Sequence, residues 1–198
     1  GLSNENKMKK LYPLLSVLFL IYWGCEGKDT TPAEVTLWGV VYSIEDTDSL
    51  NLSNSGLRGI IPLEIGSLTN LTRLYLGGNQ LTGSIPSEIG NLFNLKDLSL
   101  EDNQLTGSIP FELGNLINLR RIFLENNQLT GPIPTGIGNL TNLYYFDLTN
   151  NKLSGDIPES ICNLNWNYSS INNNQLCPPY PSCIEDYVGE QDTSNCGD

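Results

Sequence analysis

One phrase of fifteen residues returns at a fixed interval of twenty-four residues. Its copies start at residues 81, 105 and 129 and read LTGSIPSEIGNLFNL, LTGSIPFELGNLINL and LTGPIPTGIGNLTNL, with weaker copies on both sides. A period of this length indicates that each copy is one structural unit, which buries its apolar face only against its neighbours. We therefore predict a stacked coil with an extended surface, rather than a catalytic site built once from unlike groups.

The copies share the pattern L-x-x-L-x-L-x-x-N-x-L, which sets the register of the coils. Clear coils begin at residues 71, 95, 119 and 143, a degenerate first coil covers residues 47–70, and a truncated last coil begins near Trp166. The sixth position holds Leu52, Leu76, Leu100, Leu124, Leu148 and Ile171, and the ninth holds Ser55, Asn79, Asn103, Asn127, Asn151 and Asn174. Leucines at positions four and six point to one side of a strand, so we expect a continuous core.

The remaining constant residues also have structural roles. The amide of the ninth-position asparagine both donates and accepts, so we expect it to satisfy backbone groups of its own coil and of the next one. Glycine after each Leu-Thr pair suits a tight bend, and proline suits an extended segment that needs no ladder donor. The prolines are Pro62, Pro86, Pro110, Pro134 and Pro158. Function therefore has to use the variable positions between them.

This register, with LTGxIPxxIGxL after the asparagine, resembles the leucine-rich repeat family in its 24-residue plant-type class, over residues 36–176. The resemblance implies an α/β-type solenoid, a curved right-handed coil with a parallel concave sheet and mostly loops, short strands and 3₁₀ turns on the convex side. Residues 37–57 resemble the Trp-Gly-Val lead-in of the family's N-terminal cap, but lack its cysteine. We assign residues 36–56 to the cap with the first strand and residues 57–176 to the repeats.

The N-terminal region has the features of an export signal. Two lysines follow Met8 and precede a thirteen-residue apolar run that ends at Trp23, whereas about 20 residues are needed to span a bilayer. We take Met8 as the natural start, residues 1–25 as the leader and residues 26–35 as a flexible tether. Cys25 follows a glycine and resembles the lipidated cysteine of bacterial lipoprotein signals. The alternative is an ordinary signal peptide that happens to contain this cysteine.

We therefore expect an exported protein, either a bacterial outer-membrane or cell-surface lipoprotein or a secreted protein. A plant origin is the main rival, because the repeat class is abundant in plant receptors. Sequons occur at Asn51, Asn70, Asn139 and Asn167, and they matter only if the chain is eukaryotic.

The amino-acid composition of the chain argues against some classes of binding partner. The chain carries 22 acidic and 10 basic residues and no histidine, with a formal charge of −12. This balance argues against nucleic acid, whose phosphates require a basic surface, and against direct contact with an anionic membrane face. The absence of histidine removes the commonest general base and a frequent zinc ligand, and we predict neither a cofactor nor a metal. Membrane association is expected only through a lipid anchor at Cys25.

Four cysteines gather at the C-terminal end of the chain, at Cys162, Cys177, Cys183 and Cys196. In an exported chain they indicate two disulfides that close this end of the solenoid. Three pairings are possible, and we favour Cys162–Cys177 with Cys183–Cys196 because both close short loops; a zinc site is the alternative. We assign residues 177–198 to this cap and an acidic tail. Beyond Ile184 the tail has five acids and no base, so we expect it to be solvated and mobile.

Positions three, five and seven of each coil face outward on the predicted concave sheet, and position two lies on its rim. The predicted binding surface comprises Arg73, Tyr75, Lys96, Asp97, Glu101, Arg121, Phe123, Glu125, Tyr144, Tyr145 and Asp147. Arginine and aspartate alternate at position three, which predicts a ladder of weak ion pairs. Glu101 and Glu125 are neighbouring like charges, which destabilise unless Arg121 or a ligand relieves them. Exposed aromatic residues are typical of protein interfaces and sugar platforms, with scattered side chains that have no partner as the alternative.

Three functions compete. We favour a non-enzymatic binding module of the cell surface or the secreted fraction, whose concave face recognises a protein or a glycan. Ice binding is the second, because a threonine column runs along the repeats. The column contains Thr82, Thr106 and Thr130 and breaks at Arg58 and Ser154. The third is a glycosidase with Glu101 and Glu125 as a retaining pair, for which no walled pocket is indicated. The ligand and the oligomeric state stay open.

Overall fold

The computed structural model describes residues 33–164 and 168–197. The predicted leader (residues 1–25), nearly all of the tether and the predicted lipidation site Cys25 lie outside these residues, as do Trp166 and the sequon at Asn167. Within the described part of the chain, no helix is both long enough and apolar enough to cross a membrane.

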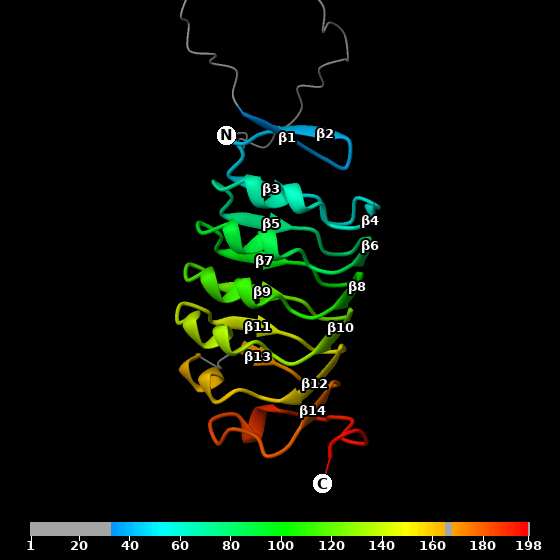
Figure 1. Cartoon of the computed structure of the whole chain (residues 1–198), viewed down its shortest axis with the longest axis vertical. Helices are drawn as coiled ribbons and strands as arrows, with labels where there is room; N and C mark the ends of the chain where they lie inside the picture. Colours follow the sequence, from blue (N-terminus) through cyan, green and yellow to red (C-terminus); the bar gives the residue numbers. More distant parts are fainter. Residues whose placement is uncertain (1–32, 165–167, 198) are drawn as a thin grey trace, which may run out of the picture. The chain divides into compact units, whose positions relative to one another are not determined.

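Each coil contributes one short strand to a parallel sheet of six strands, here called the concave sheet (Figure 1). Its strands are β3 (Ser49–Asn51), β5 (Arg73–Tyr75), β7 (Asp97–Ser99), β9 (Arg121–Phe123), β11 (Tyr145–Asp147) and β13 (Tyr168–Ser170). They lie side by side in chain order without offset, so Arg73 stands beside Asp97, and Asp97 beside Arg121. The repeat period therefore aligns equivalent positions in columns across this sheet.

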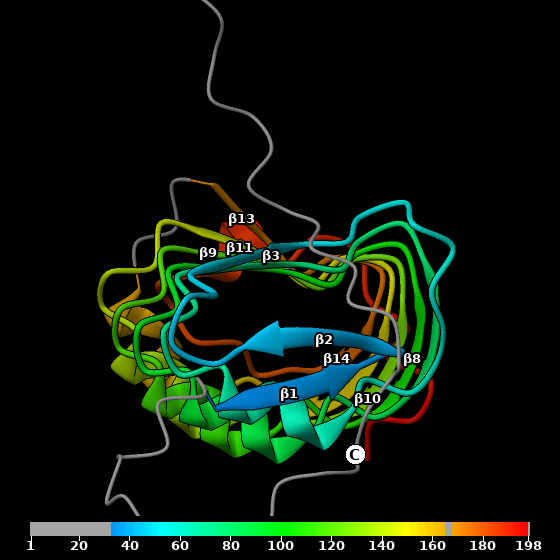
Figure 2. The ribbon, with the colours of Figure 1, turned by 90° about the horizontal axis from the view of Figure 1, so that it is seen from above.

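A second sheet and a row of 3₁₀ helices complete each coil. The second sheet has the parallel strands β4 (Arg58–Gly59), β6 (Gln80–Gly83), β8 (Gln104–Gly107), β10 (Gln128–Gly131), β12 (Lys152–Asp156) and β14 (Gln175–Cys177). The 3₁₀ helices are η1 (Leu63–Ser67), η2 (Ser87–Asn91), η3 (Phe111–Asn115), η4 (Thr135–Asn139) and η5 (Glu159–Asn163). Seen along the solenoid axis, the concave sheet and the 3₁₀ row lie on opposite sides, and the second sheet joins them (Figure 2). The predicted solenoid is confirmed.

Branched apolar side chains fill the interior of every coil. At positions four and six, Leu74, Leu98 and Leu124 are completely buried, and Phe146 takes the place of leucine in the fourth clear coil. Leu52, in the degenerate first coil, is only partly buried. No coil could bury these side chains alone, so the stack itself creates the core.

The ninth-position asparagines are buried and join neighbouring coils. The Nδ2 of Asn79 donates to the carbonyls of Leu52 and Leu76, at 2.9 and 2.7 Å, and its Oδ1 accepts the N–H of Leu57 at 3.0 Å. The same set of bonds recurs at Asn103, Asn127, Asn151 and Asn174. The predicted pairing with two coils is confirmed, but the second coil is the preceding one rather than the next. The reason is that each side chain points back toward the backbone of the coil before it.

A β-hairpin covers the N-terminal end of the core. Strands β1 (Glu34–Leu37) and β2 (Val40–Ser43) pair antiparallel around Trp38 and Gly39, whose φ values are 48° and 79°. Val35 and Leu37 are buried in the core, and Figure 2 shows the hairpin lying across the end of the coils. Apolar burial therefore closes this end without a disulfide. The hairpin begins two residues before the boundary predicted for the cap.

Two disulfides close the C-terminal end, but not in the favoured pairing. Cys162 is bonded to Cys183 and Cys177 to Cys196, with Cα–Cα distances of 5.7 and 5.6 Å. The prediction that all four cysteines form disulfides is confirmed, and the pairing Cys162–Cys177 with Cys183–Cys196 is wrong. The reason is the geometry of a coil, since Cys162 lies in η5 and Cys177 in β14, on different sides. Each bridge instead spans 21 or 19 residues, close to one repeat, and joins one turn of the chain to the next.

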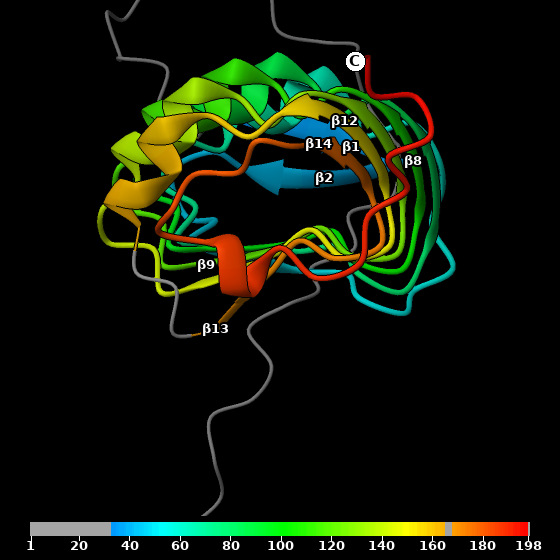
Figure 3. The ribbon, with the colours of Figure 1, turned by 90° about the horizontal axis from the view of Figure 1, so that it is seen from below.

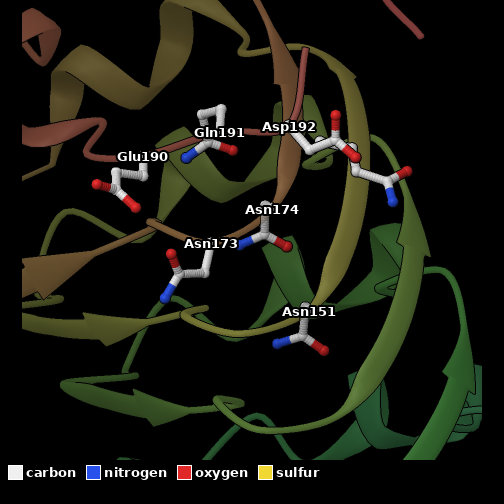
Figure 4. Close-up of a pocket in the computed structure, with 7 residues that line it drawn as sticks. Asn151, Asn173, Asn174, Glu190, Gln191 and Asp192 are labelled. Atoms are coloured by element: carbon white, nitrogen blue, oxygen red, sulfur yellow. The ribbon is translucent and has the colours of Figure 1, made fainter. Parts of the chain in front are cut away.

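The acidic tail continues the solenoid instead of leaving it. After η6 (Glu185–Tyr187), Val188 is buried and the Nε2 of Gln191 donates to the carbonyls of Ile171 and Val188, at 3.0 and 2.8 Å. The Oε1 of Gln191 accepts the N–H of Leu176 at 3.2 Å, so this side chain repeats the bonds of a ninth-position asparagine. Most of the tail is exposed to solvent, as predicted, but Val188 and Gln191 pack it against the last coil, and Figure 3 shows this stretch folded under that coil. Gln191 stands in line with Asn174 and Asn151 at a polar cavity (Figure 4).

Candidate functional site

All eleven residues of the predicted binding surface lie on or beside the middle strands of the concave sheet. The strands themselves carry Arg73, Tyr75, Asp97, Arg121, Phe123, Tyr145 and Asp147. Lys96 and Tyr144 directly precede β7 and β11, and Glu101 and Glu125 follow β7 and β9 by two residues. Pairing without offset stacks these residues in columns. Their role in ligand binding stays a prediction.

Asp97 is buried, and its carboxylate is hydrogen-bonded to neighbouring side chains. Its carboxylate accepts two bonds from Arg121, from Nε at 2.6 Å and from Nη2 at 2.8 Å, and one from the Tyr75 hydroxyl at 3.3 Å. The bond from Arg121 is the main cause that holds the pKa of Asp97 below its ordinary value. Asp97 is only 7% exposed, and Ser99 on the same strand is buried as well. The centre of β7 therefore exposes less side-chain surface to a ligand than the outward-facing positions of Asp97 and Ser99 would predict.

The predicted alternation of ion pairs is reduced to one pair. Arg121–Asp97 is the single salt bridge among the described residues, because the Nε of Arg73 donates to the Ser49 hydroxyl at 3.3 Å. Arg121 is thereby committed to Asp97 and does not neutralise the two glutamates. That relief, considered from the sequence, is wrong.

Glu101 and Glu125 form a small acidic cluster at the C-terminal ends of β7 and β9. Glu101 lies over Gly77, where a side chain would collide with its carboxylate: a Cβ there would be 2.1 Å from Oε1. The Oε2 atoms of Glu101 and Glu125 are both buried and have no hydrogen-bond partner within the described residues. Burial is the main cause that raises the pKa of Glu125 to about 7, and Asp147, Glu101 and Asp102 add to it. Each carboxylate thus has one buried oxygen that no described residue satisfies.

The raised pKa of Glu125 predicts a pH-dependent stability. The neutral form is favoured in the folded state, so its stabilising contribution is full below pH 4.5, the ordinary pKa, and is lost as pH rises to about 7. Glu125→Gln removes this loss. Its melting temperature should exceed that of the wild type by an amount that grows from pH 4.5 to 7 and then stays constant. The matched control is Glu64→Gln on η1, which makes the same chemical change on an exposed side chain. A pH-independent difference for Glu125→Gln would contradict the assignment.

Aromatic side chains that are at least partly exposed lie on the C-terminal half of the concave sheet. The rings of Phe123 and Tyr145 pack with centroids 4.6 Å apart at 34°, and both remain partly exposed. Tyr144 on the rim is 43% exposed, and Tyr168 on β13 is 66% exposed. Tyr168 was not among the predicted residues, although it stands at position three of the last coil, three residues before the sixth-position Ile171. Tyr75 differs from these residues, since its hydroxyl is bonded to Asp97.

A second polar ladder, also not predicted, borders the concave sheet at position eight. Each of its amides donates to the preceding coil at 2.7 Å, from Asn126 to Asp102, from Asn150 to Asn126 and from Asn173 to Asn150. All four residues have positive φ, between 52° and 57°, which asparagine and aspartate tolerate better than other side chains. The signal in the sequence was the recurrence of Asn, Asp or Gly directly before the ninth position.

The threonine column lies on the second sheet, away from the concave sheet. Thr82, Thr106 and Thr130 stand on β6, β8 and β10 and are exposed. The column ends at Arg58 on β4 and at Ser154 on β12, as the repeat register predicted. The pairing of these strands is offset by two residues, so Thr82 stands beside Gln104 and Thr106 beside Gln128, and the threonines run obliquely across the sheet.

Two cavities in the described part of the chain lie away from the glutamate pair. A polar cavity of about 340 Å³ lies in the C-terminal cap between Asn151 and Gln191. A groove of about 630 Å³ lies on the convex side beside Pro110, Phe111 and Pro134. Among the described residues there is no group of three or more histidine, cysteine or acidic side chains that could hold a metal ion.

Comparisons with known proteins agree with this architecture. The Leucine Rich Repeat family profile matches residues 47–68, 70–92, 94–116, 118–140 and 142–164. No curated protein gives a match to the sequence. Among solved structures, the Arabidopsis receptor kinase HAESA, in complex with the peptide hormone IDA and the co-receptor SERK1, aligns with a TM-score of 0.64 and 36% identity. That alignment covers 69% of this chain and 25% of the HAESA chain, so this chain spans about a quarter of that receptor chain.

Two further structures are similar over comparable lengths. The BIR2 ectodomain from Arabidopsis thaliana aligns with a TM-score of 0.59 and 34% identity, over 67% of this chain and 71% of that chain. A plant ice-binding protein aligns with a TM-score of 0.58 and 35% identity, over 65% of this chain and 42% of that chain.

Proposed function

Because the chain belongs to the leucine-rich repeat family, in which variable side chains stand on an open sheet, we propose that it is a binding module whose concave sheet holds a segment of a partner protein. The observation that carries this proposal is the packed pair Phe123 and Tyr145, partly exposed beside the exposed Tyr144. Large aromatic side chains are the usual anchors of protein interfaces. The HAESA structure, with its bound peptide hormone, supports the same use of this fold.

The aromatic pair gives the proposal a direct test. The probes are an array of synthetic peptides and an array of glycans, screened with the disulfide-bonded chain. We expect a peptide hit whose affinity falls at least tenfold in the double variant Phe123→Ala/Tyr145→Ala, because two interface anchors are removed. The matched control is Phe111→Ala, which removes a 73% exposed ring on η3, opposite the concave sheet.

Each outcome has one meaning. A glycan hit that is lost in the double variant keeps the concave sheet as the site and changes the ligand class to a sugar. A hit that survives the double variant, or is lost in Phe111→Ala instead, overturns the proposed surface.

We infer that the module does not act as an enzyme. Support comes from the glutamate pair, since Glu101 and Glu125 line neither the cap cavity nor the convex groove. A glycosidase needs a site that encloses the scissile bond between two carboxyl groups. Release of reducing sugar from a panel of glycans, lost in Glu101→Gln, would overturn this inference.

Ice binding is a second candidate, favoured by the exposed column on β6, β8 and β10 together with the similarity to a plant ice-binding protein. It places the function on the second sheet rather than on the concave sheet. Thr106→Lys should then abolish inhibition of ice recrystallisation, while Phe123→Ala/Tyr145→Ala should leave it intact. A wild-type protein without such inhibition rules this candidate out.

The two disulfides and the ectodomain neighbours indicate an exported protein. We further propose that the chain is held at the cell surface through a lipid on Cys25, on the basis of the apolar run and the glycine that precede this residue. The mass of the N-terminal peptide from membrane-extracted protein tests this. An unmodified Cys25, or a mature chain cleaved elsewhere, contradicts it.

A further inference from the structure

Apart from Asp48, beside the first strand, and Asp97, which is paired with Arg121, the charges on the concave sheet are separated by sign along the direction of its strands. Where the strands begin, the sheet carries the residues here called the basic edge: Arg73, Lys96, Arg120 and Arg121. Where the strands end, it carries the acidic edge: Glu101, Asp102, Glu125 and Asp147. Four of the six basic residues in the described part of the chain are gathered at the basic edge. In a chain with a formal charge of −12, this edge is an exception to the general surface.

The basic edge keeps free cations although one of its members is paired. Asp97 occupies Arg121, but Lys96 and Arg120, one residue before β7 and β9, are exposed. Neither forms an ion pair within the described residues, where Arg121–Asp97 is the single salt bridge. Two cations on adjacent strands repel each other, and an anionic group placed between them removes that repulsion.

The acidic edge has no basic side chain of its own coils beside it. No lysine or arginine stands at the ends of β5, β7, β9 or β11, or in the turns that follow them, through the ninth position of each coil. Asp102 and Asp147 each accept a hydrogen bond, from Asn126 and from the backbone of Thr149. In contrast, Glu101 and Glu125 each keep a buried oxygen without a partner among the described residues. Both glutamates are partly exposed as residues, and a cationic group of a ligand beside them would offset their mutual repulsion.

The two edges are separated by the length of a short extended peptide. Arg120 and Glu125 are five residues apart on β9 and its turn, which is about 17 Å at 3.3 Å per residue. Phe123 and Tyr145 lie between the edges and supply an apolar contact there. A ligand in extended conformation along the strand direction would therefore meet cations first, then aromatic rings, then carboxylates.

We propose that the partner segment is an extended peptide that carries an acidic residue and a basic residue four or six positions apart, because side chains alternate along an extended chain and only an even spacing turns both toward the sheet. Its acidic side chain binds between Lys96 and Arg120, and its arginine or lysine binds beside the partly exposed side chains of Glu101 and Glu125. The inference rests on the proposed binding function of the concave sheet and adds the chemistry and orientation of the ligand to it. Charge complementarity of this kind selects partners and fixes their register.

The probe is a set of synthetic octapeptides with one Asp and one Arg, separated by three to six residues and placed in both orders, with Leu or Gly between them. Matched peptides carry Asn for Asp or Gln for Arg. At low ionic strength, where exposed charges are least screened, we expect the doubly charged peptides to bind at least tenfold more tightly than either matched peptide. The best spacing should be four or six positions, and peptides with an odd spacing should bind more weakly because their two charges point to opposite faces.

Two single variants assign the two ends. In Glu125→Gln, replacing the peptide's Arg by Gln should no longer weaken binding, while replacing its Asp should still do so. In Arg120→Gln, the dependence should be reversed. Glu125 faces Asp147, Glu101 and Asp102 and is bonded by its own backbone N–H, and its pKa is about 7. Raising the pH from 6 to 8 should therefore tighten binding of the doubly charged peptides to the wild type, and not to Glu125→Gln.

The inference and the proposed function can fail separately. Peptide hits that depend on Phe123 and Tyr145 but not on the peptide charges leave the binding function standing and overturn the bipolar ligand. Identical effects of Glu125→Gln and Arg120→Gln on both ends of the peptide also overturn it, as does an array without any charge-dependent binding. Hits that ignore both the aromatic pair and the charges overturn the concave site itself.

Discussion

Asn127→Ala is expected to lower the free energy of unfolding by about 4 kcal/mol, since buried groups left unpaired cost about 1–3 kcal/mol each. The Nδ2 of Asn127 donates to the carbonyls of Leu100 and Leu124 at 2.9 and 3.2 Å, and its Oδ1 accepts the N–H of Leu105 at 3.0 Å. Alanine supplies none of these bonds, and the site is closed to water because Asn127 is 8% exposed. Urea unfolding monitored by circular dichroism measures the loss.

Asn115→Ala is the matched control for this prediction. Asn115 ends η3, is exposed, and its amide makes no hydrogen bond within the described residues. The same chemical change there should shift stability by less than about 0.5 kcal/mol, as is usual for surface substitutions. Equal losses in the two variants would contradict the role assigned to the buried ladder.

Gly138→Ala and Gly136→Ala are expected to change stability in opposite directions, although both substitutions lie in η4. A Cβ on Gly138 would stand 2.3 Å from the backbone oxygen of Ser160 in the next coil, so the two coils would have to separate. Forcing atoms into a packed interior costs about 1–3 kcal/mol. A Cβ on Gly136 would meet its nearest atoms at an ordinary 3.5 Å. Alanine there should stabilise by about 0.4–1 kcal/mol, because it restricts the unfolded chain.

Thermal and urea unfolding of both variants test the prediction together. Gly138→Ala with the wild-type midpoint would mean that the coils are not packed as closely as the structure places them. The same contact explains Cys162, which stands at the equivalent position of the last 3₁₀ helix. No further 3₁₀ helix stacks beneath η5 in the described part of the chain, so a side chain is tolerated there and reaches Cys183.

The candidate site was predicted in its membership but not in its interactions. The repeat register placed Phe123, Tyr145 and Glu125 correctly, because a 24-residue period puts equal positions in columns. It did not predict that Arg121 would choose Asp97 over the glutamates, or that Asp97 would become buried. Those outcomes depend on side-chain reach between strands, which no pattern of residue types specifies. Tyr168 was left out of the prediction, although the register that assigns Ile171 to the sixth position puts it at the outward-facing third position.

At the C-terminal end, too, the sequence predicted one part of the structure and missed another. That four cysteines would form two disulfides followed from their number and place, whereas the pairing depended on which sides of the coil η5 and β14 occupy. The path of the tail likewise depended on Gln191, which bonds to Ile171 and Leu176. A search for ninth-position asparagines would not find this residue, because it is a glutamine. It reaches these partners because the buried Val188 holds the chain beneath the last coil.

By itself, then, the sequence determined the solenoid, the register of every coil and the columns of exposed residues, since these follow from a period that repeats local physical chemistry. The tertiary structure alone decided the disulfide pairing, the preceding coil as the asparagines' second partner, and the commitment of Arg121 to Asp97. It also left Glu101 and Glu125 with free, buried oxygens. Each of these depends on the distance between atoms that lie one coil apart in space, and that distance exists only after the coils have stacked.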